Sequence, residues 1–205
     1  GGLMLNPFDR TAFYGYSDFD VRHNLNSNVM LELPFGRGRK FMSGSNALVD
    51  ALVGGWQLST IFRYRSALPT AVAYSGLWPT NFSFTTLADP VGPYEAEVQT
   101  NDRGNPAIFP TTNEAASNWK PMLPGEVGTR AAVRLDDYYN TDVSLTKSFS
   151  LSGGSRIQVR AEAFNAFNNV NFTNVSLDAS SPNSFGQFTA AAPARVVQFA
   201  LRYEF

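Results

Sequence analysis

The chain has 205 residues and a formal net charge of −1, with 43% hydrophobic and 16% charged residues. It contains no cysteine, which excludes a disulfide framework, a catalytic thiolate and a cysteine-based zinc site. Basic residues gather only at Arg37, Arg39 and Lys40, so we expect no nucleic-acid partner. No run of 18 apolar residues offers a transmembrane helix, whereas a β-barrel span needs only about 9–11 alternating residues.

The first strand-like segment covers residues 21–33 and ends at Pro34, which cannot donate a ladder hydrogen bond. His23 lies on its apolar parity, where we expect a packing or rim residue rather than a catalyst. The stretch PFGRGRK that follows predicts a tight basic turn. The apolar parity holds Val21, Leu25, Val29, Leu31 and Leu33, and the polar parity holds Arg22, Asn24, Asn26, Asn28 and Glu32.

Two further alternating segments, residues 56–74 and 138–151, flank a long stretch without sustained periodicity. That stretch, residues 75–135, carries most of the prolines and predicts a long loop. The third strand leads into SGGS at Ser152–Ser155, which predicts a hairpin turn. Lys147 lies on the apolar parity of this strand, and we expect it to extend its ammonium group to a nearby interface.

The last two predicted strands, residues 156–172 and 195–205, alternate most strictly and are joined by a loop at 174–194. Their polar parity predicts a row of charges that pair across adjacent strands and face a wet lumen. That row comprises Arg156, Gln158, Arg160, Glu162, Arg202 and Glu204. Their aromatic residues gather near strand ends, which favours two interfacial girdles over a sandwich core. The predicted girdle residues are Phe164, Phe167, Phe172 and Tyr203.

The stretches LPFGRGRKF, RAEAFNAFNNVNF and FGQFTAAAPARVVQFALRYEF resemble the C-terminal end of TonB-dependent outer-membrane transporters, in particular the Oar-like branch. The resemblance implies an all-β fold, an antiparallel up-and-down meander that forms part of a barrel of about twenty-two strands. It implies long outer loops at 75–135 and 174–194, short periplasmic turns and a location in the bacterial outer membrane. It also implies that Phe199, Leu201, Tyr203 and Phe205 form a signal for the barrel-assembly machinery.

The resemblance covers only the last part of the family's chains, so we expect a C-terminal portion of a longer precursor, without a plug domain among these residues. The expected function is that of a barrel segment in a receptor that takes up an unidentified substrate. Its expected partners are outer-membrane lipid, the remaining strands and plug, and the assembly machinery.

Two other functions compete with this interpretation. Five strands leave two open edges, so a processed fragment could pair with further copies and form a self-assembling β-rich structural subunit or surface fibre. A secreted sugar-binding sandwich would use Trp56, Trp78 and Trp119.

The sequence points to no catalytic constellation, so we expect no enzyme activity, no cofactor and no metal site. The glycines of Gly36–Arg37–Gly38 lack the third glycine and the strand-to-helix context of a phosphate cradle. Four carboxylates flank predicted strand ends and could converge on a hard cation, although caps of turns explain them better. They are Asp18, Asp20, Asp136 and Asp137.

Overall fold

The computed structural model describes residues 8–9, 11, 14–75, 87–123 and 126–205, and the chain separates into two compact units. We call Asn24–Tyr64, Tyr139–Val170 and Pro193–Phe205 the sheet unit. We call Gly1–His23, Arg65–Tyr138 and Asn171–Ala192 the loop unit. Trp78 and part of the predicted loop at 75–135 lie outside the described residues.

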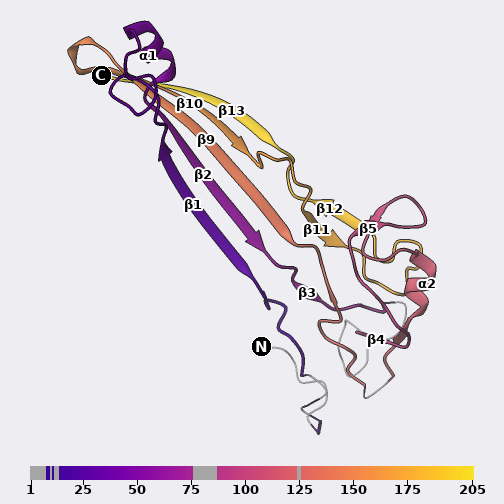
Figure 1. The fold of residues 1–205 in the computed structure, drawn as a ribbon. Helices are drawn as coiled ribbons and strands as arrows, with labels where there is room; N and C mark the ends of the chain where they lie inside the picture. Colours follow the sequence, from indigo (N-terminus) through magenta and orange to yellow (C-terminus); the bar gives the residue numbers. More distant parts are fainter. Residues whose placement is uncertain (1–7, 10, 12–13, 76–86, 124–125) are drawn as a thin grey trace. The chain divides into compact units, whose positions relative to one another are not determined.

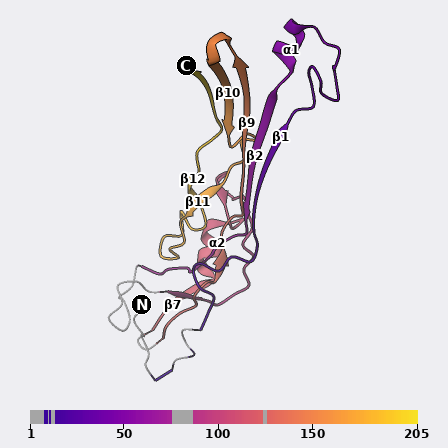
Figure 2. The same cartoon turned by 90° about the vertical axis from the view of Figure 1, so that its left-hand side faces the viewer.

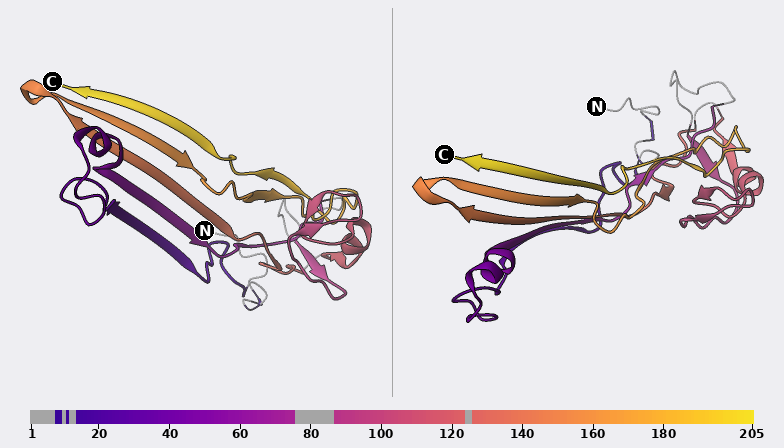
Figure 3. Two further views of the ribbon diagram at one scale, coloured as in Figure 1. Left: turned by 45° about the horizontal axis from the view of Figure 1, so that its top comes forward. Right: turned by 90° about the horizontal axis from the view of Figure 1, so that it is seen from above.

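The sheet unit contains one five-stranded antiparallel sheet (Figure 1), which confirms the predicted all-β meander. Its neighbouring strands follow the order β1-β2-β9-β10-β13. Figure 3 shows that this sheet twists and curves from β13 to β1. The strands are β1 (Asn24–Glu32), β2 (Trp56–Arg65), β9 (Tyr138–Ser150), β10 (Arg156–Phe164) and β13 (Val196–Glu204).

The register between β10 and its neighbours keeps the two parities on separate faces. β10 pairs with β13 without a shift from Arg156↔Glu204 to Phe164↔Val196, and it pairs with β9 from Arg156↔Ser150 to Ala163↔Val143. Because successive side chains in a strand point to opposite faces, an unbroken register aligns like parities across all three strands. We call the resulting surfaces the apolar face and the polar face.

The short connections lie at one end of the sheet, together with the C-terminus (Figure 2). Helix α1 (Ala47–Val53) links β1 to β2, and the 3₁₀ turn η2 (Ser152–Gly154) links β9 to β10. Asn46 begins α1 by accepting a hydrogen bond from the Val49 amide at 2.9 Å. The basic turn packs closely on the end of α1 at Gly36, whose φ is 116°. Only glycine fits there, since an added Cβ would lie 2.7 Å from the Gly54 Cα.

In its described residues the loop unit consists of short strand pairs and the short α-helix α2 (Thr112–Ser117), and it has a hydrophobic core of its own. Phe185, Ile108 and Val72 are almost fully buried there, and the Phe185 ring stacks on Phe109 at 5.3 Å. The pairs are β3 (Pro69–Thr70) with β8 (Val133–Arg134), β4 (Ala88–Pro90) with β7 (Trp119–Pro121), β5 (Gln99–Thr100) with β6 (Pro106–Ala107), and β11 (Phe172–Val175) with β12 (Phe188–Ala191).

Two predicted strands end earlier than the alternation suggests. In the segment 56–74 the long strand ends at Arg65, the Ser66 amide donates to the His23 carbonyl at 2.9 Å, and only the short strand β3 follows. The segment 156–172 ends at Phe164, because Asn165 has a φ of 51° and its amide donates to the Asp142 carboxylate at 3.0 Å. Among the described residues, every helix is too short or too polar to cross a bilayer.

Candidate functional site

The apolar face of the sheet carries hydrophobic side chains that are exposed on β13 and partly exposed on β2, β9 and β10. On β13, Phe199 is 80% exposed and Leu201 is 74% exposed. The core cluster of buried residues found in the described chain lies entirely in the loop unit, and the sheet unit contributes no residue to it. A large exposed apolar surface marks a site of contact with a partner or a membrane. Ring contacts of Tyr64 with Tyr139 and of Trp56 with Lys147 place the even positions of β2 on the same face as the odd positions of β9. The face is formed by Leu58, Thr60 and Phe62 of β2, Val143 and Leu145 of β9, Ile157, Val159, Ala161 and Ala163 of β10, and Val197, Phe199 and Leu201 of β13.

Aromatic residues bound this face at both ends of the strands. At one end, the rings of Tyr64 and Tyr139 lie 4.9 Å apart. At the other end, Phe149 of β9 and Tyr203 of β13 are both paired with Ile157 of β10, which lies between them. Ten residue steps on β9 separate Tyr139 from Phe149, or about 33 Å along the strand at roughly 3.3 Å per residue. A strand tilted by about 35–45° spans about 23–27 Å of that length, which matches the apolar band of roughly 25 Å in outer-membrane barrels.

The aromatic residues that bound the face differ from the predicted girdle set. Phe164 shares its parity with Glu162 and therefore lies on the polar face, because β10 has no bulge before it. Phe172 belongs to β11 of the loop unit, where its ring stacks on Phe188 at 4.1 Å. Phe167 lies in the turn after β10 and is 72% exposed. Tyr203 is on the apolar face, with its ring 5.9 Å from that of Phe205.

Four aromatic residues at these two boundaries were not predicted as girdle residues, although each lies on the apolar parity. They are Trp56, Tyr64, Tyr139 and Phe149. Their common signal is an aromatic residue at the first or last apolar position of a strand. That signal identifies an end of a membrane span better than the density of aromatics along the chain does.

The polar face carries paired charges. Arg156 donates to Glu204 across the β10–β13 pair, and Arg202 lies 3.0 Å from the same carboxylate. Gln198 donates to Glu162 at 2.5 Å, and Arg160 lies 3.7 Å from Glu162. Exposed ion pairs add little stability. They make this face hydrated, because moving its charges into contact with lipid tails would cost a large free energy.

Lys147 is the charged residue that the alternation places on the apolar face, and it is only 4% exposed. Its ammonium donates to the Gly54 and Asp50 carbonyls at the end of α1. It also lies 5.6 Å from the ring of Trp56 and 5.1 Å from that of Phe149. Lys147 was predicted to extend its ammonium group to a nearby interface, and in the structure that group reaches the end of α1, where backbone carbonyls and aromatic faces satisfy its charge.

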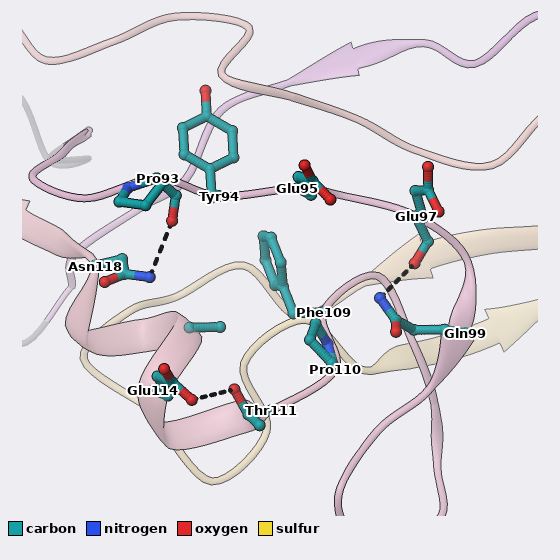
Figure 4. A pocket seen from close by; sticks show the side chains of 11 residues that line it. Pro93, Tyr94, Glu95, Glu97, Gln99, Phe109, Pro110, Thr111, Glu114 and Asn118 are labelled. Carbon is teal, nitrogen blue, oxygen red and sulfur yellow. Dashed lines mark hydrogen bonds between the residues drawn. The ribbon is translucent and has the colours of Figure 1, made fainter.

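The loop unit holds a cavity of about 340 Å³ (Figure 4). Glu95, Glu97 and Glu114 are among the residues that line it, together with the aromatic residues Tyr94 and Phe109. Glu114 accepts a hydrogen bond from Thr111 at 3.4 Å. Such a lining can hold a cationic or hydrogen-bond-donating group against an aromatic wall. The remaining lining residues are Pro93, Gln99, Pro110, Thr111, Ala115 and Asn118.

The tryptophans considered for sugar stacking are engaged within the protein where the structure describes them. Trp119 is 3% exposed in the core of the loop unit, beside the Tyr94 ring at 4.8 Å. The Trp56 indole donates to the Leu52 carbonyl at 2.8 Å. Trp119 is therefore unavailable to a sugar, while Trp56 already uses its indole N–H and has the Lys147 ammonium 5.6 Å from its ring.

The four carboxylates considered for a cation have other partners. Asp20 pairs with Arg134, Asp18 lies 3.4 Å from Arg130, and Asp137 accepts a hydrogen bond from the Ala67 amide at 2.8 Å. Burial raises the pKa of the Asp136 carboxyl. Hydrogen bonds from the Phe172 and Asp137 amides lower it, but by less. Across the described ranges, no group of three metal-ligating side chains comes together.

Asp178 joins two distant segments of the loop unit. Its carboxylate accepts a hydrogen bond from the Ser75 amide at 3.1 Å and one from the Ser180 hydroxyl at 2.7 Å, and it also accepts one from the Ser75 hydroxyl. Burial alone raises the pKa of this carboxyl, but these hydrogen bonds outweigh burial, so the pKa lies below its usual value. The ionised form therefore stabilises the loop unit.

We expect Asp178→Asn to reduce the dependence of loop-unit stability on acid. A lowered carboxyl pKa stabilises the fold above the unfolded-state pKa of about 3.9, and this stabilisation is lost as the pH falls through the folded-state value. Urea unfolding followed by tryptophan fluorescence should show a deficit for Asp178→Asn at pH 7 that shrinks by pH 3. Ser75→Ala should reproduce part of the deficit. An equal deficit at both pH values would contradict the linkage.

A sheet with one lipid-compatible face bounded by aromatics and one charged face defines the wall of a transmembrane β-barrel. A family model described as an outer membrane beta barrel domain matches residues 1–198. The chain therefore belongs to this family and is located in the outer membrane. Searches of curated proteins and of solved structures gave no match.

Proposed function

We propose that the chain is the barrel-wall segment of a TonB-dependent receptor of the Oar-like type, which takes up a substrate across the outer membrane. The proposal rests on the unequal lengths of the connections between consecutive strands of the sheet. Residues 66–137, between β2 and β9, and residues 165–195, between β10 and β13, supply most of the loop unit, which has its own core and cavity. Outer-membrane barrels have long loops outside and short turns in the periplasm.

In this proposal each unit has a separate role. The sheet unit forms part of the wall, with its apolar face in lipid and the charges of its polar face lining the lumen. The loop unit forms an outer surface where a ligand first binds, and its acidic cavity is the candidate contact. Further strands pair with the open edges of β1 and β13, because an unpaired edge in hydrocarbon costs several kcal/mol per unsatisfied group. We assign no catalytic step to the chain.

Cysteine labelling of intact cells tests the orientation. These 205 residues contain no cysteine, so Ser181→Cys in the loop unit and Ser152→Cys in η2 each introduce one thiol into this chain at an exposed position. A membrane-impermeant maleimide should label Ser181→Cys in intact cells, and should label Ser152→Cys only after the outer membrane is opened. The reverse pattern would overturn the orientation. Labelling of both in intact cells would favour the surface fibre.

Growth measurements test energised uptake. A strain that lacks the protein and a strain that lacks the inner-membrane energy-coupling complex should share a growth defect on the same source within a panel of nutrient sources. Restoring the protein should rescue the first strain but not a strain that lacks both. A defect that appears only in the first strain would indicate a passive pore and contradict TonB dependence.

A further inference from the structure

Helix α1 is held on the apolar face of the sheet by side chains of that face. Lys147, whose position on β9 is in register with Val159, donates to the Gly54 and Asp50 carbonyls. The Trp56 indole donates to the Leu52 carbonyl at 2.8 Å. The last carbonyls of a helix generally have no partner within the helix. Here the Leu52 and Gly54 carbonyls find theirs on the sheet, whereas the Asp50 carbonyl also accepts a hydrogen bond from the Gly54 amide at 2.8 Å. α1 has no basic residue in its last turn, and the sheet supplies the cation instead.

The other side of α1 is apolar and exposed. Leu48 is 79% exposed and Leu52 is 74% exposed. Residues four positions apart lie on the same side of a helix, so the two side chains form one patch. Asp50, the charged residue of α1, turns away to accept a hydrogen bond from the Arg37 amide. α1 therefore presents leucines outward while its polar groups bind the basic turn and the sheet.

This patch continues a surface that family membership already places in lipid. Lys147 aligns with Val159, which aligns with Leu201, so α1 is attached to the same face that exposes Leu201 and Phe199. The bound turn carries Arg37, Arg39 and Lys40, the residue types that lie at the level of lipid phosphates. A helix with one apolar side next to cations is typical of an interfacial helix.

We propose that α1 is an interfacial helix that inserts Leu48 and Leu52 among the acyl chains of the leaflet surrounding the short-turn end of the barrel. Lys147 and Trp56 hold it on the wall, so α1 widens the lipid-contacting surface at that level. The inference depends on the outer-membrane family and not on TonB-dependent transport.

Fluorescence quenching in vesicles tests this contact. The protein with Leu52→Cys carries an environment-sensitive fluorophore and is reconstituted in phosphatidylcholine–phosphatidylglycerol vesicles. We expect strong quenching by nitroxide-labelled lipid and weak quenching by iodide, as for Leu201→Cys on the wall. Ser152→Cys, at the same end of the sheet, should show the opposite preference. Iodide quenching of the Leu52 probe equal to that of the Ser152 probe would overturn the proposal, and would indicate a water-exposed helix or one awaiting a protein partner.

A second variant tests the attachment. Lys147→Met removes the ammonium, so the Leu52 probe should lose part of its lipid quenching and gain iodide quenching. Lys147→Arg keeps a cation and should retain more of the lipid contact. Heat-modifiable mobility on gels reports whether each variant assembles. If Lys147→Met fails to assemble, the Leu52 probe in the natural background still decides the question. An assembled Lys147→Met with unchanged quenching would refute the role of Lys147.

Discussion

Phe185→Ala is expected to destabilise the loop unit by about 3–5 kcal/mol, the usual cost of truncating a large buried aromatic side chain. Phe185 has no exposed surface, its ring lies 5.3 Å from that of Phe109, and the Trp119 ring lies 6.5 Å away. Removing it leaves a cavity in a core of short strand pairs, which cannot collapse to fill the space. Hydrogen exchange should show the effect at the Ile108 amide, which donates to the Gly186 carbonyl at 2.8 Å.

Because the two units have separate contacts, exchange at amides of β9 and β10 should remain unchanged in Phe185→Ala. Exchange at Ile108 should accelerate by roughly a factor of 100 or more. Leu123→Ala is the matched control, since Leu123 also belongs to the loop unit but is 63% exposed. We expect it to change stability by less than about 0.5 kcal/mol. Equal acceleration in both variants, or acceleration spread through the sheet, would contradict an independent core.

The sheet could be predicted from the sequence because alternation encodes it directly. Ile157, Val159, Ala161 and Ala163 mark one face of β10 by themselves, and the neighbouring strands repeat the pattern. What alternation does not encode is where a strand stops. β10 ends because Asn165 adopts a positive φ and bonds to Asp142 of the adjacent strand, a contact between residues 23 positions apart.

The loop unit could not be predicted because its core has no period. Val72, Ile108, Trp119 and Phe185 are far apart in sequence and meet only through tertiary packing. The docking of α1 was missed for a related reason: Lys147 bonds to carbonyls more than 90 residues away. A charge on an apolar parity signals an unusual environment, but not which backbone groups satisfy it.

Phe199→Arg is expected to cost about 2–4 kcal/mol of folding free energy in a bilayer, because it puts a charge near the middle of the lipid-facing surface. Phe199 aligns with Ala161, which aligns with Leu145 between the aromatic boundaries at Tyr139 and Phe149. An arginine side chain at this position is too short to place its charge in either headgroup region unless the bilayer distorts.

The matched control is Gln198→Arg, one residue away on the opposite face. Gln198 already donates to Glu162, so an arginine there gains an ion pair in a hydrated lumen and should change stability by less than about 1 kcal/mol. Urea unfolding of the protein from phospholipid vesicles measures both variants. If Gln198→Arg lost as much stability as Phe199→Arg, the face that carries Glu162 would be no more hydrated than the face that carries Phe199. The assignment of lipid to the apolar face would then fail, since a barrel wall requires the two neighbouring positions to respond differently to the same charge.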